Sequence, residues 1–321
     1  MDFLQIMQSN LKNKGLSDSS IKLYTKNLSK LNDGLPLKNF KFLENVDEVM
    51  TKINHLKPTT RKSYLTCIVS ILNTYKDNKK LTKICDKYYT HMNEAVKQLK
   101  ETPTDVMSKT QSENWIDWND ILEIRNNIHT TVMKFVNNKE LSLNQYSQLL
   151  NLVVLSLYVL TPPRRNQDYA LMNIVKTKEN ANDKTINYLI LDEKTFDFNV
   201  YKTAKHNEDT VINIPEDLYH VIEMYIKHHP LLKNGKVNKT TDIVFLVNHS
   251  GEPLKAVNSI TRILNKIFGR KIGVSMLRHS YLTYKYGNEV KEMKDDAEKM
   301  GHSVQTQKDY IKDKKLTVKF E

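Results

Sequence analysis

A polar stretch at residues 101–112, which has no hydrophobic periodicity, limits how the chain can fold more than any other feature. Its sequence, Glu-Thr-Pro-Thr-Asp-Val-Met-Ser-Lys-Thr-Gln-Ser, is typical of segments that connect domains. At 321 residues the chain is long enough for two domains, each with its own core. We therefore predict one domain over 1–100, a linker over 101–112 and a second domain over 113–321.

The pattern of residues 1–100 is helical throughout. Ser17–Ser20 is a cluster of N-cap residues, and apolar side chains follow it at helical spacing. Pro58 opens a second helix, with Arg61 and Lys62 at its start. We predict a small helical bundle whose basic helix ends, including Arg61 and Lys62, are suited to contacting DNA.

The second domain mixes helices with short strands. The helical patterns cover 118–137 and 142–160, begin again near Arg165 and after Pro215, and resume from about Lys255. Between them, three β-branched or aromatic runs, 188–191, 196–201 and 210–214, are separated by polar turns. The expected fold class is therefore mainly α, with a small antiparallel sheet in the second domain.

Positive charge is concentrated in the front third of the chain. Residues 1–100 carry 18 Lys and Arg against 9 Asp and Glu, within a formal net charge of +12 for the whole chain. Such an excess is typical of a segment that lies on a polyanion. A Lys- and Asn-rich composition also arises in AT-rich genomes, so the charge alone does not show that the protein binds nucleic acid.

The cysteines and the apolar segments indicate an intracellular protein. Cys67 and Cys85 are the only cysteines and form no Cys-x-x-Cys pattern, which argues against disulfides and a cysteine zinc site. The N-terminus lacks a secretory layout, and the apolar run 149–160 is shorter than a bilayer requires. We expect a protein that is not secreted and has no membrane partner.

Five residues that can carry chemistry follow one another in the second half of the chain. They are Arg165, Lys202, Arg278, His302 and Tyr310. Arginines bind phosphate oxygens in bidentate fashion and stabilise charge that develops there. A lysine or histidine can donate a proton to a leaving oxygen, and a tyrosine can attack phosphorus. The set is suited to breaking a phosphodiester without a metal.

The segments around these residues resemble the tyrosine recombinase (phage-type integrase) family. They are Thr161-Pro-Pro-Arg-Arg-Asn-Gln-Asp168, Tyr201-Lys-Thr203, Ser275-Met-Leu-Arg-His279, and Gly301-His-Ser303 followed by Asp309-Tyr310. The first and third segments look most like those of recombinases from large DNA viruses and mobile elements. The resemblance is limited to these four segments within 161–310, whereas residues 1–100 are similar only in charge and helical pattern.

The family pattern favours one of two neighbouring candidates at each of two positions. Its first arginine stands three residues before an acidic residue, which fits Arg165 with Asp168 and leaves Arg164 as the second choice. Its lysine lies on a β-hairpin, where Lys202 has Lys205 as a competitor.

The third segment departs from the family pattern. The family has His-x-x-Arg followed by another histidine, and here Arg278 and His279 match while Ser275 stands in the place of the leading histidine. A serine hydroxyl can hydrogen-bond a phosphate but is not a base near neutral pH. The group that takes the proton of Tyr310 is therefore left open.

The resemblance implies a site-specific recombinase or integrase that acts on double-stranded DNA as a homotetramer on two sites. Tyr310 would form a 3′-phosphotyrosyl bond, Arg165 and Arg278 would hold the phosphate, His302 would assist, and Lys202 would protonate the leaving oxygen. No metal, ATP or other cofactor is implied. The protein would work where its target DNA lies, in a host nucleus, a viral factory or a bacterial cytoplasm.

Two other functions stay open at this point. A type IB topoisomerase shares the tyrosine chemistry but acts alone, and a DNA-binding protein that has lost catalysis would be consistent with Ser275. Other classes lack a site, because the sequence has no phosphate-binding glycine loop and no two-metal carboxylate cluster. His220, His228 and His229 lack a ligand spacing, so we expect them at a solvated helix end.

Overall fold

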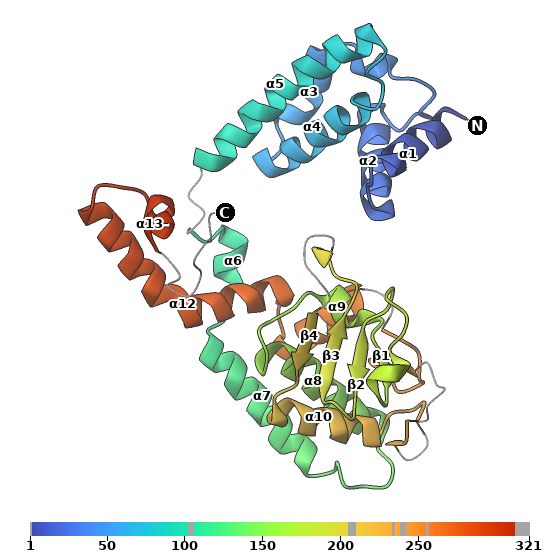
Figure 1. Cartoon of the computed structure of the whole chain (residues 1–321), viewed down its shortest axis with the longest axis vertical. Helices are drawn as coiled ribbons and strands as arrows, with labels where there is room; N and C mark the ends of the chain where they lie inside the picture. The colour runs from blue at the N-terminus through green and yellow to red at the C-terminus, as the bar shows by residue number, and fades with distance from the viewer. Residues whose placement is uncertain are drawn as a thin grey trace, which may run out of the picture. The chain divides into compact units, whose positions relative to one another are not determined.

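The computed structural model describes residues 2–101, 106–204, 210–232, 235–237, 243–254 and 257–311. The chain divides into two compact units, Met1–Val106 and Met107–Glu321 (Figure 1). Each has its own hydrophobic core. Within the described residues, no helix has the length and apolar character needed to span a membrane.

Unit 1 is entirely helical over its described residues. Ser17 caps α2, because its hydroxyl accepts a hydrogen bond from the backbone N–H of Ser20 at 3.3 Å. Pro58 occupies the first turn of α4, where its missing N–H costs nothing. The elements are α1 (Phe3–Asn13), α2 (Asp18–Leu31), η1 (Lys41–Leu43), α3 (Val46–Asn54), α4 (Pro58–Leu72) and α5 (Lys79–Glu101).

The core of unit 1 forms around α4. Its buried side chains face α1, α2, α3 and α5, and the ring of Tyr88 on α5 is buried beside them. The Tyr88 hydroxyl donates to the carbonyl oxygen of Leu43 at 3.0 Å, which satisfies this buried polar group. Both cysteines are free and buried in this unit.

Unit 2 combines helices with one sheet. Its helices are α6 (Lys109–Glu113), α7 (Trp118–Met133), α8 (Leu143–Val159), α9 (Asn166–Ala170), η2 (Lys178–Asn180), α10 (Glu216–Lys227), α11 (Val257–Phe268), α12 (Val274–Lys299) and α13 (Val304–Tyr310). Its strands are β1 (Asn173–Val175), β2 (Tyr188–Ile190), β3 (Thr195–Phe198), β4 (Thr210–Asn213) and β5 (Ile243–Val244). The prediction of a mainly helical fold with a small sheet is confirmed.

The sheet has the order β4-β3-β2-β1-β5. The three predicted β-runs form β2, β3 and β4, which pair antiparallel as expected. β1, which the sequence did not predict, pairs parallel with β2 and antiparallel with β5, so the whole sheet is mixed. β1 has only three residues and they are all buried, so it shows no alternation that would identify a strand.

Two other elements differ from the sequence predictions. Residues 109–112, inside the predicted linker, belong to α6, where Ser108 and Gln111 form a reciprocal capping box. His229, expected at a solvated helix end, is only 2% exposed. Its Nε2 lies 3.1 Å from the carbonyl oxygen of Val244, and burial lowers the pKa of this imidazole.

Candidate functional site

Arg165 lies where two prolines end the long buried helix of unit 2. Pro162 and Pro163 follow α8 and prevent its continuation, and Arg165 then takes an extended backbone conformation as the N-cap of α9. Its side chain is half-buried. Within the described part of the chain, the Arg165 guanidinium has no hydrogen-bond or ion-pair partner, so its charge is available to a ligand.

Arg164, the second choice from sequence, is engaged in contacts within the chain. Its Nε donates to Asp168 Oδ2 at 3.0 Å, and its guanidinium carbon lies 3.8 Å from the centre of the Phe198 ring. Burial raises the pKa of the Asp168 carboxyl, while the positive charges of Arg164 and Arg165 oppose that shift. The acidic residue that marks Arg165 in the sequence is therefore bonded through its side chain to Arg164.

Lys202 lies in the connection between β3 and β4, and its side chain is exposed. The preceding ring, Tyr201, is 5.3 Å from the guanidinium carbon of Arg164. The hairpin connection therefore starts beside the segment that carries Arg165. Lys205, the competing lysine, lies outside the described residues.

Arg278 lies in the first turns of α12. Met276, Leu277 and Ser280 are buried and fix this end of the helix to the core, which leaves Arg278 half-buried. Ser275 and His279 are exposed on the same end of the helix, and His279 Nε2 is 3.4 Å from the side-chain nitrogen of Gln111 on α6.

The segments that carry Arg165 and Arg278 meet on α11. The side chain of Asn166 donates to the hydroxyl of Thr261 at 2.9 Å. A Cβ placed on Gly273, the N-cap of α12, would lie 3.6 Å from Thr261 Cγ2. Thr261 thus hydrogen-bonds the residue after Arg165 and lies close to the turn that leads to Arg278. We call the region formed by Arg165, Lys202 and Arg278 the arginine locus.

His302 and Tyr310 are placed together at the other end of α12. Their ring centres are 5.8 Å apart, and the backbone N–H of His302 donates to the carbonyl oxygen of Ala297 at 3.1 Å. Tyr310 ends α13 and is 72% exposed. Figure 1 shows α13 beside the end of α12 that lies away from the strands.

Helix α12 separates these two groups of residues. It is continuous over Val274–Lys299, and a helix rises about 1.5 Å per residue, so Arg278 and Lys299 are roughly 32 Å apart along its axis. Neighbours of Arg165, Lys202 and Arg278 contact one another or α11, whereas His302 and Tyr310 lie at the other end of α12. The structure does not bring all five into a single site within one chain.

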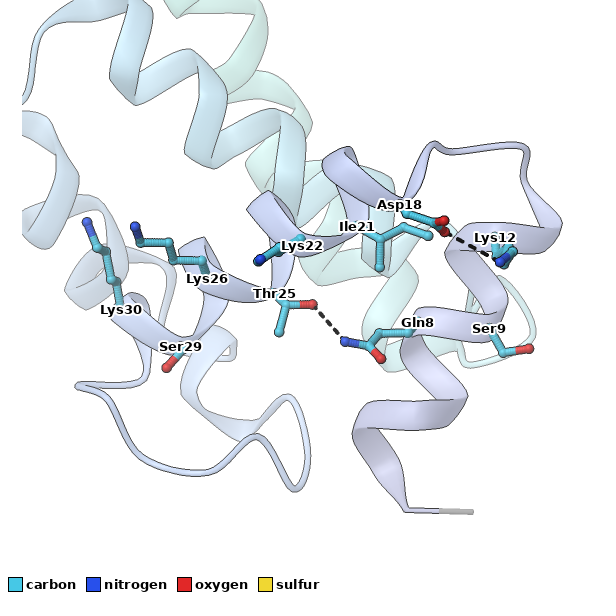
Figure 2. Close-up of a pocket in the computed structure, with 10 residues that line it drawn as sticks. All are labelled: Gln8, Ser9, Lys12, Asp18, Ile21, Lys22, Thr25, Lys26, Ser29 and Lys30. Atoms are coloured by element: carbon cyan, nitrogen blue, oxygen red, sulfur yellow. Dashed lines mark hydrogen bonds and ion pairs between the residues drawn. The ribbon is translucent and has the colours of Figure 1, made fainter. Parts of the chain in front are cut away.

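A basic groove of about 830 Å³ lies between α1 and α2 in unit 1. Lys22, Lys26 and Lys30 follow one another along α2 at intervals of four residues and are exposed (Figure 2). Lys12 also lines the groove, and its Nζ lies 3.4 Å from Oδ1 of Asp18. Sequence reasoning missed this stripe, although the four-residue spacing opposite the buried Leu28 could have revealed it.

The basic residues chosen from sequence lie at the start of α4. Arg61 is half-buried, and its guanidinium donates to the side-chain oxygen of Gln98 on α5. Lys62 is exposed. Of the two, Lys62 has the more accessible charge.

Comparison with known proteins gives little support for a function. The chain matches no protein-family model and no curated protein. Among solved structures, a crystal structure of XerA recombinase aligns with 97% of this chain and 95% of that chain, at 11% sequence identity and a TM-score of 0.32. A TM-score this low does not support an inference about function, so the functional interpretation depends on the residues of the chain itself.

The described residues contain no group of three or more histidine, cysteine, aspartate or glutamate side chains placed to hold a metal ion. The arginine locus presents guanidinium and ammonium groups. These suit a phosphate, because both charge and hydrogen-bond geometry match its oxygens.

The different roles of the two adjacent arginines can be tested by unfolding. Arg164→Ala should lower the free energy of unfolding by about 2–4 kcal/mol, because it leaves the buried Asp168 without its charged partner. This is less than for a fully buried pair, since the Arg164 side chain keeps 20% exposure. Arg165→Ala should lower it by less than about 1 kcal/mol, because Asp168 loses a nearby positive charge but no hydrogen bond or ion pair is broken.

Urea unfolding of the two variants beside wild type measures both values. A larger loss in Arg165→Ala than in Arg164→Ala would contradict these roles. Asp168→Asn provides the control. In that background Arg164→Ala should lower the free energy of unfolding by much less than it does in wild type, because the buried carboxylate that Arg164 pairs with is gone.

Proposed function

We propose that the protein breaks and rejoins DNA strands as a site-specific recombinase, with Tyr310 as the nucleophile. The observation that supports the proposal is at the arginine locus, where Thr261 lies beside both the residue after Arg165 and the turn that leads to Arg278. Arg165, without a partner in the described residues, is then available to a phosphate. His302 and Tyr310, whose rings lie close together, would supply a hydrogen-bonding imidazole and the nucleophile.

The proposed reaction is a transfer of the phosphate from a sugar oxygen to a phenol oxygen. The Tyr310 hydroxyl oxygen attacks phosphorus, the bond from phosphorus to the 5′-oxygen breaks, and a 3′-phosphotyrosyl bond forms. The phenol loses one proton and the departing 5′-oxygen gains one, so the proton balance is zero. Attack by the 5′-hydroxyl of another strand reverses the step, and because the ester bond is conserved no ATP is needed.

Each residue has a role that follows from its chemistry. Arg165 and Arg278 hold the nonbridging oxygens and stabilise their charge in the transition state. Lys202, whose side chain is exposed, would donate a proton to the leaving 5′-oxygen. His302 hydrogen-bonds the phosphate or the phenol, and Ser275 and His279 supply further donors beside Arg278.

Unit 1 would bind the DNA backbone. Lys22, Lys26 and Lys30 are exposed along one helix face, and helix geometry places their Cβ atoms about 6 Å from one to the next. Lys62 would add a contact from α4. A tetramer on two DNA sites would supply the paired strands that recombination exchanges, within the compartment that contains the target DNA.

A second candidate, DNA binding without cleavage, is favoured by one observation. The exposed Ser275 stands where the family pattern has a histidine, and Tyr310 is distant from Arg278 along α12. A topoisomerase that acts as a single subunit would also use Tyr310. It would form its covalent bond on one isolated site, whereas a recombinase depends on paired sites.

The nucleophile can be tested by trapping the covalent intermediate. On DNA nicked near the cleavage site, the released fragment diffuses away, so wild type should accumulate a complex that survives denaturant. Tyr310→Phe should form none while its DNA affinity stays within about twofold of wild type. Tyr284→Phe, which removes the hydroxyl from another exposed tyrosine, is the matched control and should behave as wild type.

The outcomes separate the candidate functions. An adduct that persists in Tyr310→Phe would contradict the assignment of the nucleophile. Tight binding with no adduct from any variant would instead support the DNA-binding candidate.

The DNA interface of unit 1 can be tested by the salt dependence of binding. Replacing Lys22, Lys26 and Lys30 together with Gln should lower the slope of log affinity against log salt by about 2–3, because each lost phosphate contact contributes roughly 0.9. Lys79, Lys83 and Lys87 have the same spacing on α5 and are also exposed. Their triple Gln variant has the same charge and should keep the wild-type slope.

Fluorescence anisotropy with a labelled duplex over a salt series measures these slopes. An equal reduction of this slope in both triple variants would show that binding depends on the total charge rather than on the α2 stripe.

A further inference from the structure

The side-chain amide of Asn187 joins the two chain segments that carry Arg165 and Lys202. Asn187 directly precedes β2 and is only 6% exposed. Its Nδ2 donates to the carbonyl oxygens of Asp168 and Val200, each at 2.9 Å, and its Oδ1 accepts from the backbone N–H of Val200 at 2.7 Å. Asp168 lies three residues after Arg165. Val200 lies two residues before Lys202.

These three hydrogen bonds use both N–H groups of the Asn187 amide and its oxygen, so the amide is held in one orientation. A carboxylate has no donor and a hydroxyl has only one, so neither could make the same set of bonds. Because both backbone groups of Val200 pair with one side chain, the amide takes the place of a peptide group on a neighbouring strand. The chain therefore stays attached to the sheet beyond the end of β3.

Backbone hydrogen bonds fix the chain on both sides of this amide. The carbonyl oxygen of Asn187 accepts from the backbone N–H of Asn173 at 2.9 Å, which attaches it to β1. In the hairpin connection, the backbone N–H of Ala204 donates to the carbonyl oxygen of Tyr201 at 3.0 Å. This bond closes a turn that contains Lys202. Lys202 is thus exposed at its side chain but carried by a backbone that is attached to the sheet.

We propose that Asn187 is a positioning residue, which places the ammonium group of Lys202 at the leaving oxygen of a phosphate held by Arg165. This inference rests on the proposed function and adds to it a residue that acts through Lys202 rather than on the substrate. A misplacement of about 1 Å can lower a reaction rate by about 10²-fold. An amide that fixes the hairpin connection to the Arg165 segment limits such displacements.

The alternative is that the Asn187 amide only stabilises the fold. Loss of hydrogen bonds at a buried site lowers stability, whichever residue they position. Such a loss would reduce the amount of folded protein and slow the cleavage of every substrate by the same factor. A misplaced lysine would slow only those reactions whose leaving group needs a proton. The leaving group therefore distinguishes the two roles.

DNA with sulfur in place of the bridging 5′-oxygen supplies a leaving group that needs no proton. A thiol ionises with a pKa of about 8.5, whereas a sugar hydroxyl is nearly as weak an acid as water, whose pKa is about 15.7. When Tyr310 attacks this DNA, the bond from phosphorus to sulfur breaks, the thiolate departs and the phenol proton passes to solvent. The rate of adduct formation would be measured on this DNA and on ordinary DNA, both nicked near the cleavage site.

The two substrates should respond differently to the variants. On ordinary DNA, Asn187→Ala should slow adduct formation by about tenfold or more, and Lys202→Ala by about 10²-fold or more. On the sulfur-containing DNA, both should react within about threefold of wild type, because no proton is needed. Arg165→Ala should be slow on both substrates, since the phosphate charge must be stabilised whichever group leaves.

A double variant tests whether Asn187 acts through Lys202. If the amide only positions the lysine, its loss has no further effect once the lysine is gone. On ordinary DNA, the double variant Asn187→Ala/Lys202→Ala should therefore react no more slowly than Lys202→Ala alone.

Two further variants control for folding. Tyr146→Phe removes a buried hydroxyl that is bonded to Tyr225 and Val247 near the start of α8, so it disturbs the core of unit 2 away from the hairpin connection. It should keep the wild-type ratio of rates on the two substrates. Asn187→Gln keeps the amide and displaces it by one methylene. It guards against a folding defect in Asn187→Ala and should also lose rate only on ordinary DNA.

The outcomes bear on separate claims. Equal slowing of the Asn187 variants on both substrates would overturn the positioning role and leave the proposed function standing. So would a slowing by Asn187→Ala that multiplies with that of Lys202→Ala. Absence of adduct from wild type on both substrates would instead contradict the proposed function itself.

Discussion

The burial of α8 on nearly all of its faces is the constraint that arranges unit 2. From Leu149 to Val159 only Asn151 has more than slight exposure, and α7, α10 and α11 cover the helix. A helix that is apolar all round must be enclosed, so these elements have to pack around it. Pro162 and Pro163 then end α8 at the surface of this core and place Arg165 beside α11, which also supports the start of α12.

Much of this arrangement could be predicted from periodicity and capping. Ser17, Pro58 and Ser142 begin helices where the sequence indicates, and the runs that became β2, β3 and β4 pair as expected. β1 was missed because three buried residues next to a short helix contain no repeat. The parallel pairing of β1 with β2 depends on the tertiary path of the chain, which local patterns do not contain.

The candidate site was predictable as a set of residue types but not as a geometry. The sequence favoured Arg165 and kept Arg164 as the second choice, and only the structure shows how the two differ: Arg164 is bonded to Asp168 and stacked on Phe198. The order of Arg278, His302 and Tyr310 says nothing about the helix between them. Residues 282–292 include Gly287 and Asn288, which are weak helix formers, so local propensity does not show that α12 is unbroken.

The central claim is that Tyr310 becomes covalently linked to DNA, and its most direct test identifies the linked residue. Adduct formed by wild type on nicked DNA would be digested with nuclease and trypsin, and the modified peptide sequenced by mass spectrometry. The account predicts a 3′-nucleotide on the fragment that contains Tyr310, with its phosphate on the phenol oxygen. A nucleotide on any other residue, or an adduct with a 5′-phosphate link, would contradict it.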